Sequence, residues 1–158
     1  MALEIERKFL VKSNNFKKEV HNSYAIKQGF LNSNKERTVR IRLRNDIGYI
    51  TVKGKSSDGG LSRFEWEEEI SKLDAERLIE LCEEGIIEKI RYEVKYGNHI
   101  FEVDEFLGEN KGLVVAEVEL NHKNESFERP IWLGTEVTGD NKYYNSQLSK
   151  YPYKKWKK

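Results

Sequence analysis

Cysteine, proline and methionine are scarce in this sequence, and long apolar runs are absent. The 158 residues include one cysteine, one methionine and two prolines. The lone Cys82 excludes an internal disulfide and suits a reducing compartment. No apolar run approaches the roughly 18 residues of a membrane span, and no signal peptide precedes Glu4. We therefore expect a cytoplasmic protein that has no membrane partner.

A strong net charge is absent as well. The 28 lysines and arginines are nearly matched by 27 aspartates and glutamates, which leaves a formal net charge of +1. Without a field of one sign over the whole molecule, nucleic acid is not an expected partner. Charged residues still make up 35% of the chain, so any function they have requires them to gather locally. The length fits one domain, over residues 1–158, with a core of its own.

Charged and apolar side chains alternate along most of the chain. Successive side chains of a strand point to opposite faces, so this alternation predicts strands that each have one charged face. In 38–44 that face carries only cations, and in 63–70 it carries only acids, whereas the strand that begins at residue 4 carries both signs. The charged faces carry Glu4, Glu6 and Lys8; Arg40, Arg42 and Arg44; Lys53; Glu65, Glu67 and Glu69; Lys89, Arg91, Glu93 and Lys95; Glu102 and Asp104; and Glu117 and Glu119.

Turn and helix signals separate these strands. Residues 45–48, 57–60 and 96–98 have the composition of hairpin turns. A helix is predicted over 74–84, introduced by Ser71 and ended by Gly85, with Leu78, Ile79 and Cys82 on its buried stripe. We expect a second helix within 13–22 and short helices after residues 121 and 145. The fold class is therefore α+β, with a large, mostly antiparallel sheet and a few peripheral helices.

Two arrangements of the sheet account for the charged faces. An open antiparallel sheet often turns one polar face to solvent, and this explains any single strand. It explains less well why cations and acids segregate onto different strands. A closed sheet would turn these faces inward and create a lumen lined by both signs. Because buried charges are costly unless they are paired or bind ions, such a lumen points to a polyanion and a divalent cation as guests.

The opening segment EIERKFLV resembles the ExExK signature of the CYTH domain, the family of triphosphate tunnel metalloenzymes. The resemblance extends from residue 4 to about residue 152. It continues in order through QGFL (28–31), VRIR (39–42), TVK (51–53), LSRFEWE (61–67), EKIRY (88–92), EVDEF (102–106), LVVAEVEL (113–120), WLGTEVT (132–138) and KYYN (142–145).

The resemblance implies an eight-stranded, closed, tunnel-like barrel with a charged lumen that binds a small-molecule triphosphate and uses Mg²⁺ or Mn²⁺. It further implies an inorganic triphosphatase that cleaves tripolyphosphate to pyrophosphate and phosphate. Two alternatives stay open on the same fold. One is an enzyme with another substrate: a thiamine or nucleoside triphosphatase, or a class IV adenylyl cyclase. The other is a polyphosphate-binding module without catalysis. The sequence also leaves a homodimer open.

The charged faces supply candidate residues for each task. Guanidinium and ammonium groups suit phosphate, and hard divalent cations prefer carboxylate oxygens. The candidates for triphosphate binding are Lys8, Arg40, Arg42, Lys53, Lys89 and Arg91, with Arg44 expected at the tunnel mouth. The candidates for metal binding are Glu4, Glu6, Glu117, Glu119 and Asp104. The candidates for catalysis are Lys89, Glu65 and Glu67, where Glu65, Glu67 and Asp104 could instead hold a second ion, orient arginines or position water.

Phe30 is a departure from the family pattern. Some bacterial relatives have tyrosine at this position, paired with the lysine that matches Lys89. Phenylalanine cannot relay a proton, so Lys89 is expected to act alone or only to bind phosphate. Tyr143 matches a family position near the end of the chain, and we expect it to be a packing aromatic.

Overall fold

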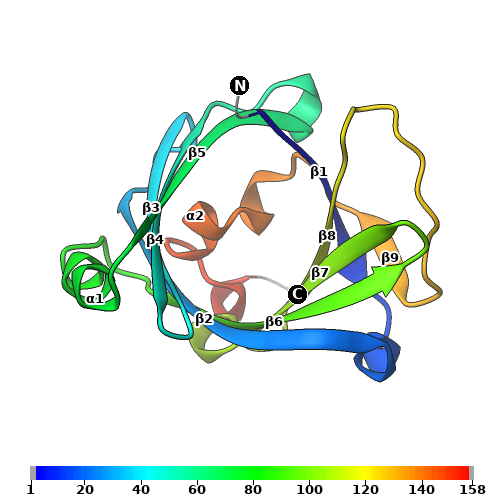
Figure 1. Cartoon of the computed structure of the whole chain (residues 1–158), viewed down its shortest axis with the longest axis horizontal. Coiled ribbons are helices and arrows are strands. Elements are labelled where there is room, and N and C mark those ends of the chain that lie inside the picture. The colour runs from blue at the N-terminus through cyan, green and yellow to red at the C-terminus, as the bar shows by residue number, and fades with distance from the viewer. Residues whose placement is uncertain (1–2, 157–158) are drawn as a thin grey trace.

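The computed structural model describes residues 3–156, and nine strands within that range form one antiparallel sheet. Their order is β5-β4-β3-β2-β6-β7-β8-β1-β9, and β5 also pairs with β1, which closes the first eight strands into a barrel (Figure 1). The closed, mostly antiparallel fold predicted from the sequence is confirmed. The strands are β1 (Leu3–Val11), β2 (Val20–Asn32), β3 (Arg37–Arg44), β4 (Ile47–Gly54), β5 (Ser62–Ile70), β6 (Ile87–Tyr96), β7 (His99–Phe106), β8 (Val114–Glu119) and β9 (Leu133–Glu136).

The predicted turns join neighbouring strands. Asn45 has φ 52° between β3 and β4, and Gly97 has φ 61° between β6 and β7. Asparagine and glycine adopt this left-handed backbone at little cost, which is why two residues are enough to reverse the chain at each place. The segment before β5 contains a short 3₁₀ helix, η2 (Asp58–Gly60), and closes through a bridge between Ser57 and Ser62.

Helix α1 (Lys72–Glu80) covers the outer face of β3 and β4. The Ser71 hydroxyl accepts a hydrogen bond from the Asp74 amide at 3.0 Å, so Ser71 is the cap that the sequence predicted. The helix begins earlier than predicted and ends at Glu80, because Leu81 is already the C-cap residue. Ile79 is buried against the barrel, together with Ala75 and Ile41, and Cys82 packs beside them.

Three other helix predictions have different outcomes. The segment 13–22 contains only the 3₁₀ helix η1 (Asn14–Lys18), because β2 starts at Val20. No helix begins between residues 121 and 140, all of which the structure describes. There the Glu125 side chain accepts a hydrogen bond from the Asn121 amide at 2.6 Å and closes a turn instead. The helix predicted after residue 145 is present as α2 (Asn145–Leu148).

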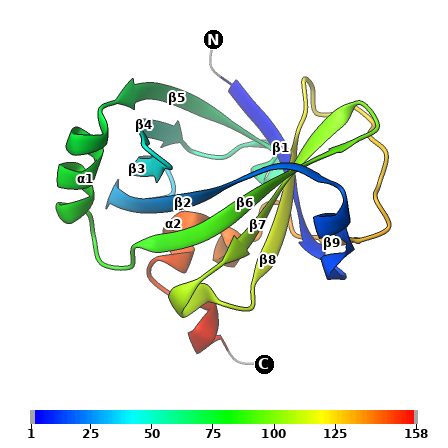
Figure 2. The same cartoon turned by 60° about the horizontal axis from the view of Figure 1, so that its bottom comes forward.

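The inward positions of the strands become apolar toward one end of the barrel. Phe30, Ile87, Phe106 and Val115 form a buried cluster there with Leu148 of α2. Figure 1 shows α2 within the ring of strands, and the turned view in Figure 2 places α2 and the segment after it toward the same end. The lumen is therefore filled at this end and open to charged side chains along the rest of its length. Tyr143 belongs to this cluster and is buried, as expected for a packing aromatic.

A second buried cluster lies outside the barrel. It includes Phe9, Phe101, Val118 and Trp132, and η1 contributes Phe16. Phe9, Phe101 and Val118 occupy outward positions of β1, β7 and β8, opposite the charged inward ones. Apolar cores on the outer faces therefore hold the barrel together, which leaves the lumen free for charge. Neither α-helix within residues 3–156 is long and apolar enough to cross a membrane.

Candidate functional site

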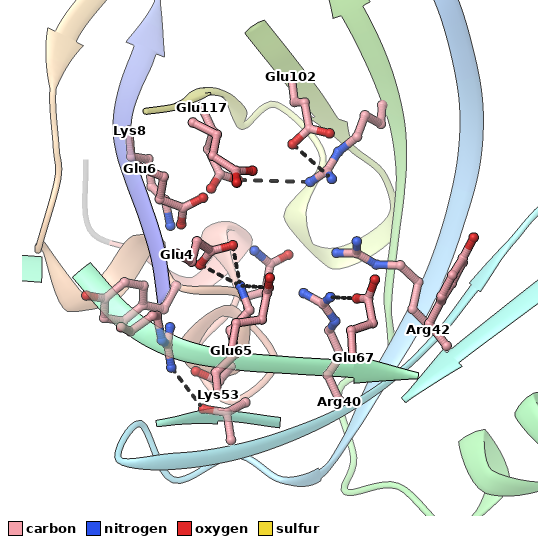
Figure 3. Close-up of a pocket in the computed structure, with 18 of the residues that line it drawn as sticks. Glu4, Glu6, Lys8, Arg40, Arg42, Lys53, Glu65, Glu67, Glu102 and Glu117 are labelled. Carbon is pink, nitrogen blue, oxygen red and sulfur yellow. Dashed lines mark hydrogen bonds and ion pairs between the residues drawn. The ribbon is translucent and has the colours of Figure 1, made fainter. Parts of the chain in front are cut away.

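The lumen contains a cavity of about 260 Å³ whose wall is almost entirely charged or polar. Figure 3 shows Glu6 and Glu117 pointing toward one another, with Arg40 and Arg42 across the opening from them. The structure thus brings together most of the residues that the alternation singled out. The predicted residues that line the cavity are Glu4, Glu6, Lys8, Arg40, Arg42, Arg44, Lys53, Glu65, Glu67, Arg91, Glu117 and Glu119.

Strand β3 supplies the centre of the cationic side. Arg42 donates from Nε to the Gln28 side-chain oxygen at 2.8 Å, and Arg40 donates from Nη2 to Thr51 Oγ1 at 3.1 Å. Both arginines therefore have fixed orientations, with donors left for a guest. Burial lowers the pKa of Arg42, and the like charges of Arg40 and Arg91 lower it further. Asp104 and Glu102 oppose this shift, so the carboxylates nearby only partly balance the cations around Arg42.

Strands β1 and β8 supply the acidic side. Their antiparallel register places Glu6 opposite Glu119 and Lys8 opposite Glu117. Burial raises the pKa of Glu6, and the neighbouring carboxylates of Glu117 and Glu4 raise it further. Carboxylates crowded in this way cannot all carry a charge unless a cation joins them.

A divalent cation fits this acidic side. Its donors are carboxylate oxygens, the ligands that Mg²⁺ and related ions prefer. Among the described residues no group of three or more acidic, histidine or cysteine side chains is already arranged to coordinate an ion. Glu4 instead lies 3.1 Å from the Lys53 ammonium, which keeps the pKa of Glu4 low although burial opposes this. Mg²⁺ commonly uses only one or two carboxylates together with substrate phosphates and water, so the pair Glu6 and Glu117 is sufficient.

Strand β5 adds two carboxylates with different surroundings. Glu67 accepts a hydrogen bond from the Thr51 hydroxyl at 2.7 Å and lies 3.5 Å from Arg40. Glu65 lies 3.4 Å from Lys53, and burial raises its pKa with a further contribution from Glu4. A raised pKa favours proton uptake by Glu65, and Glu67 is engaged with Thr51 and Arg40.

Lys89 and Asp104 lie behind the cavity wall rather than in it. Their side chains are 0% and 3% exposed, and the Lys89 ammonium lies 2.7 Å from Asp104 Oδ2. Asp104 also accepts two hydrogen bonds from Arg91, at 2.7 and 2.8 Å. Both oxygens are therefore occupied by cations, which argues against the metal-ligand role expected for Asp104. Burial lowers the pKa of Lys89 to about 7, although Asp104 opposes the shift.

Sequence analysis missed several residues of the cavity wall. Arg63 stands at an inward position of a strand already recognised, so the same alternation could have identified it. Glu102 was placed on a charged face but was given no role. Tyr144 and Asn145 belong to the C-terminal segment, where no strand pattern marks an inward side. The ring of Tyr144 lies 4.9 Å from the Lys8 ammonium. Only the folded structure brings this segment to the lumen.

Comparisons with known proteins find relatives that match nearly the whole chain. The family model described as "CYTH domain" matches residues 2–152. The chain is 48% identical to an inorganic triphosphatase of Acetivibrio thermocellus, over 99% of both chains. It is 35% identical to an inorganic triphosphatase of Nitrosomonas europaea, over 92% of this chain and 96% of the relative. A crystal structure of an inorganic triphosphatase superposes with a TM-score of 0.66 at 32% identity, covering 92% of this chain and 97% of that one.

Proposed function

Because the chain belongs to the CYTH domain family, we propose that it hydrolyses inorganic triphosphate to pyrophosphate and phosphate in the lumen of its barrel. The observation that carries this proposal is a single cavity with arginines on one side and crowded carboxylates on the other. The relatives named inorganic triphosphatase, similar over nearly the whole chain, support the reaction and the substrate. The chain is on this basis a phosphoric anhydride hydrolase.

The cationic wall binds the triphosphate. Arg40, Arg42 and Arg91 offer planar guanidinium donors, and Lys8 and Lys53 add ammonium groups nearer the acidic side. A triphosphate would relieve the repulsion that lowers the pKa of Arg42. Phosphoryl transfer requires little covalent chemistry from a protein, so positioning and charge neutralisation by these groups supply most of the acceleration.

The acidic wall holds the divalent cation that this family uses, and we assign it as Mg²⁺ or Mn²⁺. Glu6 and Glu117 would be its principal ligands, with Glu4 and Glu119 beside them. The ion, when bound, neutralises negative charge on the phosphate oxygens. Lys53 lies 3.1 Å from Glu4, and it would be available to phosphate if Glu4 were a ligand of the ion.

Strand β5 completes the reaction centre. Glu65 orients the attacking water and takes up its proton, consistent with its raised pKa. Glu67 positions Arg40 through Thr51. Asp104 holds Arg91 toward the lumen. Lys89, which the cavity wall excludes, acts through Asp104 and Asn145 rather than by direct contact with the triphosphate.

Phosphate release tests the function. Purified protein is given tripolyphosphate, ATP or thiamine triphosphate, each with Mg²⁺, Mn²⁺ or EDTA. We expect release that requires metal and is fastest from tripolyphosphate. Faster release from ATP or thiamine triphosphate would show that this compound is the preferred substrate. Tight binding of tripolyphosphate without release from any compound would show that the chain is a binding module.

Two finer points belong to the same proposal. Action in the cytoplasm is in keeping with the single cysteine, because it requires no oxidising compartment. The lumen takes a small molecule as its partner, without nucleic acid. A homodimer stays a prediction, and sedimentation of the purified protein measures it.

A further inference from the structure

A continuous chain of hydrogen bonds runs behind the cavity wall and links its cations. Arg42 contacts Gln28, Gln28 contacts Asn145 at 3.2 Å, and Asn145 contacts Lys89 at 3.0 Å. Lys89 then reaches Arg91 through Asp104. Gln28 and Lys89 are almost completely buried, at 0% and 1% exposure, whereas Asn145 lines the cavity.

The chemistry of the first link determines how both amides are turned. A guanidinium group only donates hydrogen bonds, so the Gln28 atom that faces Arg42 is its carbonyl oxygen Oε1. The Gln28 amide nitrogen Nε2 therefore faces Asn145 and donates to it. The Asn145 atom that receives this bond must be Oδ1, and the same oxygen accepts a second bond from the Lys89 ammonium.

The remaining end of the Asn145 amide is a pair of N–H donors. Nδ2 has no hydrogen-bond partner among residues 3–156, while Oδ1 is held by two buried groups. Asn145 is partly exposed and lines the same cavity as Arg42 and Arg91. A molecule bound in the cavity can therefore reach these free donors.

We propose that Asn145 is a substrate-binding residue whose Nδ2 donates to a phosphate oxygen of the bound triphosphate, and that Gln28 is the positioning residue that turns it. The inference rests on the proposed function for the identity of the ligand. It adds a neutral donor to the arginines and lysines assigned to the triphosphate. It also gives Lys89 a role without a tyrosine partner, since Lys89 anchors the amide that contacts the substrate.

An aspartate at position 145 separates substrate contact from structural support. In Asn145→Asp a carboxylate oxygen still accepts from Gln28 and Lys89, so the internal hydrogen bonds are preserved. The donors are lost, and a negative charge faces the phosphates. Asn145→Ala removes both the accepting oxygen and the N–H donors without adding charge. Gln147→Glu is the matched control, because it changes an amide to a carboxylate two residues along, where Gln147 borders a separate surface pocket.

The test measures the dissociation constant for tripolyphosphate by calorimetric titration without metal, the KM for hydrolysis with Mg²⁺, and the melting temperature. We expect both Asn145 variants to weaken binding and raise KM about tenfold or more, as for loss of a charge-assisted hydrogen bond. Asn145→Asp should melt within about 2 °C of the wild type, and Gln147→Glu should match the wild type throughout.

Affinity of Asn145→Asp within twofold of the wild type would overturn the inference, even if Asn145→Ala fails to fold. A tenfold loss of affinity in Gln147→Glu would also overturn it, because charge on this segment alone would then be sufficient. If the wild type binds tripolyphosphate but releases no phosphate, the proposed hydrolysis fails separately. In that case the calorimetric comparison alone decides the role of Asn145.

Discussion

Glu6 and Arg42 stand on opposite sides of the cavity and are assigned to opposite parts of the reaction. Glu6→Gln removes a metal ligand while keeping the side-chain shape, and Arg42→Ala removes a guanidinium that faces the phosphates. We expect each variant to lower kcat/KM for tripolyphosphate at least about 100-fold, the usual effect of losing one preorganised charged group. Initial rates with Mg²⁺ measure this effect.

Lys95→Ala is the control for both variants. Lys95 lies on β6, on the same predicted charged face as Arg91, but it is exposed and does not line the cavity. Its loss should leave kcat/KM unchanged within about twofold. Circular dichroism checks that all three variants keep the sheet. Normal turnover in Glu6→Gln or Arg42→Ala would contradict the assignment of that residue.

Alternation along each strand could show which residues point inward, but not what they would meet there. It identified Arg40, Arg42, Glu6 and Glu117 correctly as members of one cavity wall, because a strand has only two faces. It could not separate Arg91 from Lys89, which share that face. One lines the cavity and the other is covered by Asn145, and this difference depends on where a distant C-terminal segment packs.

At the scale of elements, Gly85 lies in the segment after α1 and packs closely against Ser149, in the segment after α2. Its φ is +95°, and an added Cβ would overlap the carbonyl of Ser149. We expect Gly85→Ala to lower the free energy of unfolding by at least about 2 kcal/mol, from backbone strain and from the displaced neighbour. Equilibrium unfolding in urea measures this change.

Gly59→Ala separates strain from overlap. Gly59 also has a positive φ, of +68°, but an added Cβ there has no neighbour within 4 Å. We expect a loss of only about 1 kcal/mol, the strain cost alone. Equal losses in Gly59→Ala and Gly85→Ala would show that the contact with Ser149 does not matter for stability.

The extra strand β9 is joined to β1 by an ion pair on the outside of the barrel. Arg7 donates two hydrogen bonds to Glu136, at 2.8 and 2.6 Å, and these lower the pKa of Glu136 below its ordinary value of 4.5. A lowered pKa in the folded state means that the pair stabilises the fold above about pH 4.5. This stabilisation is lost as the pH falls through the lowered pKa.

Glu136→Gln should therefore lower the free energy of unfolding by about 0.5–1 kcal/mol at pH 7, a modest effect because the pair is partly exposed. The difference from the wild type should shrink as the pH falls below 4.5 and the wild-type carboxylate is protonated. Urea unfolding at several pH values measures it, with the exposed Glu109→Gln as the control. A difference that stays constant down to the lowest pH would contradict this explanation.

The boundaries of helices and turns show where local sequence signals were sufficient to predict the structure. Ser71 was recognised as a helix cap. The two-residue turns around Asn45 and Gly97 were recognised because only a few backbone conformations, favoured by asparagine and glycine, can form such turns. The helix expected after residue 121 does not exist, since Glu125 closes a turn there. The end of α1 was also misplaced, because Gly85 serves contact with Ser149 rather than a helix terminus.

At the scale of the whole molecule, closure of the sheet explains how a chain with a net charge of only +1 can bind a polyanion. The outer clusters around Phe101 and Ile41 stabilise the barrel, and the lumen holds charges that compete with one another. Segregation of cations and acids by strand favoured a closed sheet over an open one, and the family resemblance implied the closed barrel. The sequence did not predict the apolar end, where Phe30 and Leu148 fill the barrel.

A guest of the right charge should therefore stabilise the entire fold. We expect a large excess of tripolyphosphate to raise the melting temperature by about 5–10 °C, the shift for a ligand near 100 times its dissociation constant. Differential scanning fluorimetry measures this shift, with inorganic phosphate and sodium chloride at equal ionic strength as controls. An equal shift with phosphate would indicate screening rather than binding of a triphosphate.

Crystals grown with Mn²⁺ and a nonhydrolysable tripolyphosphate analogue would test the central claim most directly, that one lumen holds both guests. Anomalous scattering locates the ion independently of the phosphates. We expect the ion between Glu6 and Glu117, and the phosphate chain against Arg40, Arg42 and Arg91. An ion or an analogue found only outside this cavity would contradict the claim.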